Sequence, residues 1–211
     1  MADSVFILAD GAPIPRGLRD RLRRGSITVA VDGAAEIARK EGWKPDFITG
    51  DFDSVKSATL SYFSKAGVEI LHTPDQNFTD LEKALAWCAL RDLRTIVVAQ
   101  ALGSRLDHSL GNLSLLKRFH SPRRDLVFYT ATERVRFAHD ESLTLKGRSA
   151  RRIAVIPFPA CRVRSRGLAF EMKGMDLEIG VKESVSNAAR RPEVKLQIEG
   201  EALVIEEYRK E

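Results

Sequence analysis

The chain has 211 residues, of which 44% are hydrophobic and 30% charged, and its formal net charge is +5. This length allows one domain or two small ones with a buried core, and the mixed charges exclude a basic nucleic-acid-binding arm. No apolar stretch is long enough to cross a membrane, and two distant cysteines, Cys88 and Cys161, do not make a disulfide framework. The first apolar run, residues 5–9, lacks the basic leader of a signal peptide. We therefore expect a cytoplasmic protein that acts on neither nucleic acids nor membranes.

Short apolar runs alternate with helical patterns up to about residue 130. The runs typical of strands buried in a parallel sheet are 5–9, 27–31, 47–49, 68–71, 95–99 and 125–129. Helices are expected between them, at about 16–24, from 37, at 55–65, at 79–90 and from 107. Ser54 is the expected N-cap of the third helix, and Thr79 with Glu82 forms a capping box at the fourth. The alternation predicts an α/β N-terminal domain with a mostly parallel sheet.

Beyond residue 130 the pattern changes to short segments of alternating polarity without a helical period. The predicted strands are 134–138, 142–145, 152–158, 161–165, 168–171, 177–179, 194–198 and 202–206. The last two flank Gly200 and read as a pair joined at that glycine. These segments predict a small antiparallel all-β C-terminal domain, sandwich-like or barrel-like, so that the domains are expected at 1–132 and 133–211.

Acidic side chains stand where predicted strands end or predicted helices begin: Asp32, Asp51, Asp53, Asp80 and Asp107. Because parallel strands share one carboxyl edge, these acids are expected to converge on a hard cation that bridges to phosphate oxygens. Mg²⁺ suits such a site because it prefers oxygen ligands. A purely structural reading is also open, since Asp favours turns and since a helix dipole stabilises a carboxylate at a helix start.

Neutral and cationic donors accompany two of these acids. Gln76 and Thr79 stand beside Asp80, and Arg105 and His108 flank Asp107, as an anionic ligand would require. The chain has no Walker A motif, dinucleotide-binding fingerprint, nucleophile elbow or zinc spacing.

Five sequence blocks then carry a resemblance when taken together and in order. They are DGAA (32–35), KPDFITGDFDS (44–54), QNFTDL (76–81), ALGSRLDH (101–108) and SVSN (184–187). With them the chain resembles the bacterial-type thiamine pyrophosphokinases over nearly its whole length. The resemblance implies an α/β domain that binds ATP and Mg²⁺, a β-sandwich domain that binds thiamine, and a homodimer whose active site is shared across the interface. The implied reaction transfers pyrophosphate from ATP to the hydroxyl of thiamine, giving thiamine diphosphate and AMP.

The resemblance also implies roles for individual residues. The Mg²⁺ ligands would be Asp51, Asp53 and Asp80, which are catalytic together with Arg105 and Asp107. Contacts to ATP would come from Asp32, Gly33, Gln76, Thr79, Arg105 and His108. Ser186 and Asn187 would bind thiamine. Either Asp80 or Asp107 would accept the hydroxyl proton.

The chain departs from the family pattern at Ala34, Asn77 and Ser104, and it lacks the tryptophan that follows the Ser-Asn pair in eukaryotic members. Three alternatives stay open at this point. One is a pyrophosphokinase for another alcohol, such as a hydroxymethylpterin. Another is a non-catalytic nucleotide-binding protein, which Asn77 in place of an acid favours. The third is a metal-dependent phosphohydrolase.

Overall fold

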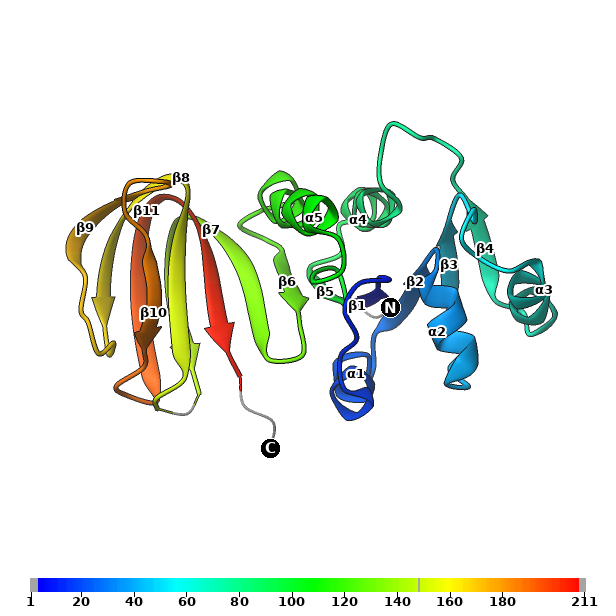
Figure 1. Cartoon of the computed structure of the whole chain (residues 1–211), viewed down its shortest axis with the longest axis horizontal. Helices are drawn as coiled ribbons and strands as arrows, with labels where there is room; N and C mark the ends of the chain where they lie inside the picture. The colour runs from blue at the N-terminus through cyan, green and yellow to red at the C-terminus, as the bar shows by residue number, and fades with distance from the viewer. Residues whose placement is uncertain (1–3, 148, 209–211) are drawn as a thin grey trace. The chain divides into compact units, whose positions relative to one another are not determined.

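The computed structural model describes residues 4–147 and 149–208. By its internal contacts the chain divides into two compact units, Met1–Ala131 and Thr132–Glu211. Figure 1 traces both units along the chain. None of the helices in the described part of the chain combines the length and apolar character that crossing a membrane requires.

The first unit is built on a parallel sheet in the order β6-β5-β1-β2-β3-β4. Its strands are β1 (Ser4–Leu8), β2 (Ile27–Val31), β3 (Phe47–Gly50), β4 (Glu69–His72), β5 (Thr95–Ala99) and β6 (Asp125–Tyr129). The central strands are mostly apolar, as is typical of strands covered on both faces; Phe6, Ile7 and Ile48 have no exposed surface. The strand order reverses at β1, which lies between β5 and β2.

Helices cover both faces of this sheet (Figure 1). They are α1 (Arg16–Leu22), α2 (Ala34–Lys40), α3 (Ser57–Lys65), α4 (Asp80–Leu90) and α5 (Leu106–Arg118). In Figure 1, α4 and α5 lie above the sheet and α1 and α2 lie below it, while α3 contacts α2 and β4. The α/β architecture with a mostly parallel sheet is thus confirmed.

Two helix starts test the predicted caps. The Thr79 side chain accepts the Glu82 N–H at 3.3 Å, so half of the predicted capping box is present. The Glu82 carboxylate forms an ion pair with Arg118 at 2.5 Å. The predicted N-cap of α3 was wrong: α3 begins at Ser57 after Lys56, because the Ser54 hydroxyl donates to the Asp32 carboxylate instead.

The second unit is an antiparallel sheet in the order β10-β8-β11-β7, with β9 also pairing with β8. Its strands are β7 (Glu133–Lys146), β8 (Arg152–Arg166), β9 (Lys173–Glu178), β10 (Ser184–Ala188) and β11 (Glu193–Glu207). A core of its own contains Ile153, Val155, Val163 and Val194, none of which is exposed. The predicted antiparallel all-β part is confirmed.

Several predicted strand boundaries in this unit were wrong. The segments at 134–138 and 142–145 are one strand, β7, and those at 152–158 and 161–165 are one strand, β8. The segments on either side of Gly200 also form one strand, β11, because the glycine makes a bulge there instead of a turn. Residues 168–171 form no strand; Leu168 makes only an isolated bridge to Ala189.

Candidate active site

A cavity of about 590 Å³ opens in the first unit at the carboxyl edge of its parallel sheet. Its walls come from the segments that follow β1, β2, β3 and β5, from the loop before α4 and from the start of α5. Open α/β sheets bind ligands at this edge, next to the point where the strand order reverses. The cavity is therefore the candidate active site.

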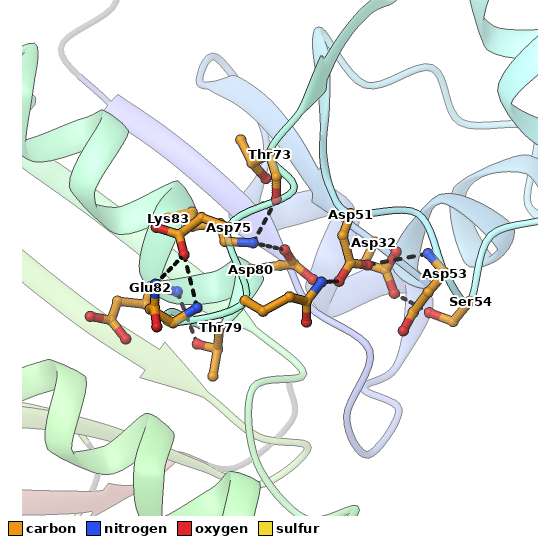
Figure 2. Close-up of polar contacts among 12 residues, drawn as sticks. Asp32, Asp51, Asp53, Ser54, Thr73, Asp75, Thr79, Asp80, Glu82 and Lys83 are labelled. Carbon is orange, nitrogen blue, oxygen red and sulfur yellow. Dashed lines mark hydrogen bonds and ion pairs between the residues drawn. The ribbon is translucent and has the colours of Figure 1, made fainter.

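Three carboxylates converge in this cavity, from Asp32, Asp51 and Asp80. Each offers an oxygen atom, and these atoms all lie within 4.8 Å of one another. The convergence follows from the topology: Asp32 follows β2, Asp51 follows the neighbouring β3, and Asp80 opens α4. Figure 2 shows the three side chains pointing toward one another.

Hydrogen bonds hold these carboxylates in different ways. The amide Nε2 of Gln76 donates to Asp51 at 2.8 Å, and the Asp53 N–H donates to it at 3.2 Å. These bonds lower the pKa of Asp51, with the Gln76 bond as the larger cause. Asp51 is therefore an anion at neutral pH.

Asp80 is in a more enclosed position. Burial raises the pKa of Asp80, against the opposing effect of Lys83. The Lys83 ammonium forms an ion pair with Asp80 at 3.0 Å and donates to the Thr73 carbonyl at 2.6 Å. Lys83 is thus a cation fixed at the rim of the acidic group, as Figure 2 shows.

Asp32 has one engaged oxygen and one free oxygen. The Ser54 hydroxyl donates to Oδ2, while Oδ1 is buried and has no hydrogen-bond partner among the described residues. A buried, unpartnered carboxylate oxygen beside two further carboxylates fits a hard divalent cation that takes oxygen ligands, such as Mg²⁺. Asp53 lines the same cavity without belonging to this three-carboxylate group.

A second polar group stands at the start of α5, where Arg105 and His108 line the cavity and Asp107 is not among the lining residues. The Arg105 guanidinium donates two hydrogen bonds to the Asp107 carboxylate. Nε donates to Oδ1 at 3.1 Å, and a terminal nitrogen donates to Oδ2 at 2.6 Å. The Arg105 hydrogen bond, helped by the His108 backbone N–H, lowers the pKa of Asp107 to about 2. Arg105 and His108 are exposed lining residues, so the guanidinium and the imidazole ring are accessible to a ligand.

Gly33, predicted to approach the nucleotide, is buried beneath the Asp10 side chain. A Cβ atom at position 33 would lie 2.3 Å from the Asp10 carboxylate, so any larger residue there would have to displace the Asp10 side chain. Gly33 is not one of the residues that line the cavity. Gln76 and Thr79, also predicted to contact ATP, do line it.

Sequence reasoning missed three residues of the cavity region: Asp10, Lys83 and Gln100. Asp10 stands two residues after β1 and Asp32 one residue after β2, so the strand-end rule that selected Asp32 also points to Asp10. Burial, and after it Asp32, raises the pKa of Asp10. Lys83 stands three residues after Asp80 on α4, a spacing that places the two side chains on one helix face.

Ser186 and Asn187, predicted to bind thiamine, lie on β10 in the second unit. The Asn187 side chain is buried and bonded to the Phe170 backbone, donating to its carbonyl at 2.8 Å and accepting from its N–H at 3.1 Å. Ser186 is exposed and has a left-handed backbone, with φ of 56°. The thiamine role of this pair stays a prediction.

The chain is similar to known proteins of one family. A family model described as thiamin pyrophosphokinase, catalytic domain, matches residues 18–128. Thiamin pyrophosphokinase 1 of Caenorhabditis elegans is 30% identical, over 92% of this chain and 85% of the relative. The thiamine pyrophosphokinase 1 of Arabidopsis thaliana is 25% identical, over 79% of this chain and 67% of the relative.

Solved structures share the fold. The thiamine pyrophosphokinase of Bacillus subtilis superposes with a TM-score of 0.85 at 20% identity, over 98% of this chain and all of that one. The thiamin pyrophosphokinase of Candida albicans gives a TM-score of 0.84 at 17% identity, over 98% of this chain and 90% of that one. The family model matches more than half of the chain, and the nematode protein is similar over most of its length. The chain therefore belongs to the thiamin pyrophosphokinase family.

Proposed function

We propose that the protein transfers pyrophosphate from ATP to the hydroxyl of thiamine, giving thiamine diphosphate and AMP. One observation carries the proposal: the carboxylates of Asp32, Asp51 and Asp80 lie within 4.8 Å of one another inside the segment that matches the family's catalytic domain. Phosphoryl and pyrophosphoryl transfer need such a group, because catalysis there is mostly positioning and charge neutralisation.

In the proposed reaction the thiamine hydroxyl oxygen forms a bond to the β-phosphorus of ATP. The bond between that phosphorus and the oxygen bridging to the α-phosphorus breaks, AMP leaves with the bridging oxygen, and the hydroxyl proton passes to a carboxylate of the site. We assign Asp51, Asp53 and Asp80 as the ligands of Mg²⁺, and we add Asp32 because its carboxylate lies beside those of Asp51 and Asp80. Bound Mg²⁺ would neutralise charge on the phosphate oxygens.

The second polar group has a complementary role in this proposal. Arg105, held at two points by Asp107, is oriented to meet negative charge on the transferred phosphates. Because Asp107 with a pKa of about 2 holds a proton poorly, its contribution is to orient the guanidinium. Gln76, Thr79 and His108 would contact ATP from the same walls.

The remaining assignments rest on the family resemblance. We propose that residues 1–132 bind ATP and Mg²⁺ and that residues 133–211 bind thiamine through Ser186 and Asn187. We further propose a cytoplasmic homodimer in which two chains share each active site.

The test of the carboxylate group is Asp51→Asn, which keeps the side-chain shape and removes the charge. AMP and thiamine diphosphate are quantified from ATP and Mg²⁺ with and without thiamine. We expect the wild type to form AMP only with thiamine and the variant to lose roughly 100-fold or more in rate. Asp176→Asn, an exposed acid of the second unit, is the charge-matched control and should retain full rate.

The outcomes separate the competing functions. Phosphate release without an acceptor identifies a hydrolase, and AMP formed with a hydroxymethylpterin in place of thiamine identifies another acceptor. ATP binding without any product identifies a non-catalytic protein. A folded Asp51→Asn variant with undiminished AMP formation would overturn the assignment of the carboxylates.

A further inference from the structure

Gln100 is held in an unfavourable state at the cavity. It directly follows β5, its φ is +61°, and only 1% of its surface is exposed. Both its side-chain nitrogen and its side-chain oxygen are buried without a hydrogen-bond partner among the described residues. A left-handed glutamine backbone and an unpaired buried amide each cost stability, so the residue calls for a compensating role.

The other carboxamides that line the cavity are already engaged. Gln76 donates to Asp51, Asn77 donates to Asp75, and the Asn112 amide donates to the Ala101 carbonyl at 2.6 Å. Within the described part of the chain, Gln100 is thus the cavity carboxamide whose side chain is left for a ligand.

Gln100 and Asp32 follow different strands along the carboxyl edge of the sheet. β5 and β2 flank β1, so a strand spacing of about 4.8 Å puts the end of β5 roughly 10 Å from the end of β2, where Asp32 lies. The loops after β1 and β5 are joined there, since the Gly11 N–H donates to the Gln100 carbonyl at 2.6 Å. A ligand with its phosphates at the carboxylates would extend its other end toward Gln100.

A carboxamide pairs well with one kind of hydrogen-bonding edge on a ligand. Its oxygen accepts and its nitrogen donates side by side, which matches an exocyclic amino group next to a ring nitrogen. Both substrates of the proposed reaction carry this edge, ATP on its adenine and thiamine on its aminopyrimidine ring.

We propose that Gln100 is a specificity-determining residue that binds the aminopyrimidine edge of a substrate with both atoms of its amide. The proposal rests on the proposed function for the identity of that substrate. It predicts that the glutamine improves recognition while it lowers the stability of the free protein.

Gln100→Gly tests the effect on stability and the effect on recognition together, because glycine adopts the left-handed backbone without strain and lacks the amide. We expect the thermal midpoint to rise and recognition of the bound edge to fall about 10-fold. Gln100→Met keeps the length and the strained backbone but removes the unpaired amide, so it should lose recognition and gain less stability than Gln100→Gly. Asp92→Gly, at an exposed residue with φ of 50° away from the cavity, is the matched control and should gain stability without any change in recognition.

Two measurements distinguish the source of the edge. Calorimetry with Mg²⁺ compares ATP with the purine riboside triphosphate that lacks the amino group; if adenine is bound, the wild type prefers ATP and both Gln100 variants bind the two equally. The KM for thiamine at saturating ATP rises in both variants if the thiamine ring is bound. The calorimetry needs no turnover, so it gives a result even if the wild type forms no thiamine diphosphate. Unchanged ATP affinity and unchanged thiamine KM in both variants would overturn the proposal.

Discussion

Asp80 and Asp107 lie in the first turns of α4 and α5, yet their pKa values shift in opposite directions. A helix dipole would stabilise both anions, so the dipole does not decide the result. At Asp80 burial raises the pKa, and the Lys83 cation lowers it only in part. At exposed Asp107 the hydrogen bond from Arg105 decides it. The contacts of each side chain therefore outweigh the shared element.

The Arg105–Asp107 pair gives a prediction for pH dependence. The pKa of Asp107 in the folded protein is about 2, below the unfolded value of about 3.9. Its contribution to stability is therefore present above about pH 4 and is lost as the pH falls through about 2. NMR titration of the Asp107 carboxyl carbon should give a midpoint near pH 2. Arg105→Lys, which cannot form both hydrogen bonds, should raise this midpoint. A midpoint near 4 in the wild type would show that the pair does not form in solution.

At the residue scale, sequence position predicted the residues whose role follows from topology. Asp51 and Asp80 were found because strand ends and helix starts share one edge of a parallel sheet. Gln100 could not be found this way. Its importance depends on a left-handed backbone and on the absence of a partner in the described structure, and neither property is visible in a sequence.

At the element scale, Gly200 shows how pairing on two sides overrides a local pattern. Apolar alternation on both sides of a glycine is the usual sign of a hairpin, which is why two strands were predicted there. In the structure β11 pairs with β7 on one side and with β8 on the other, so the strand continues past Gly200, which lies at a bulge. The partners of a strand lie far away in sequence, which is why strand character was predicted better than strand length.

The bulge predicts a difference between two glycine substitutions. At Gly200, with φ of 89°, a Cβ atom would lie 2.7 Å from the Ala160 carbonyl oxygen, whereas at Gly180, with φ of 78°, it would meet nothing within 4 Å. Both alanine variants are destabilised by a left-handed backbone that alanine disfavours. Only Gly200→Ala must also displace a neighbouring strand. We expect the free energy of unfolding to fall by about 3 kcal/mol in Gly200→Ala and by about 1 kcal/mol in Gly180→Ala. Urea unfolding followed by circular dichroism measures both, and equal losses would contradict the contact.

At the scale of the whole molecule, the two units have separate cores but only one contains tryptophan. Trp43 packs edge-on against Phe6 with ring centres 6.1 Å apart, and Trp87 lies 5.2 Å from Phe47. These are the two tryptophans of the sequence, and both belong to the first unit. The alternation of strands and helices predicted the class of this unit because each short buried strand carries its own apolar signal. Tryptophan fluorescence therefore reports the unfolding of the unit that contains the cavity.

This placement allows ligand binding to be read without turnover. A ligand that binds only the folded state at 100 times its dissociation constant adds about 2.7 kcal/mol, which should raise the tryptophan-monitored thermal midpoint by roughly 10 °C. We expect Mg²⁺ with ATP to produce this shift, a chelator to reverse most of it, and Asp51→Asn to show little of it. Mg²⁺ alone should give a smaller shift, because the three carboxylates leave much of the cation's shell to water and phosphate oxygens. An equal shift in Asp51→Asn would mean that the nucleotide binds without the carboxylate group, and the cation would then have to be sought elsewhere in the first unit.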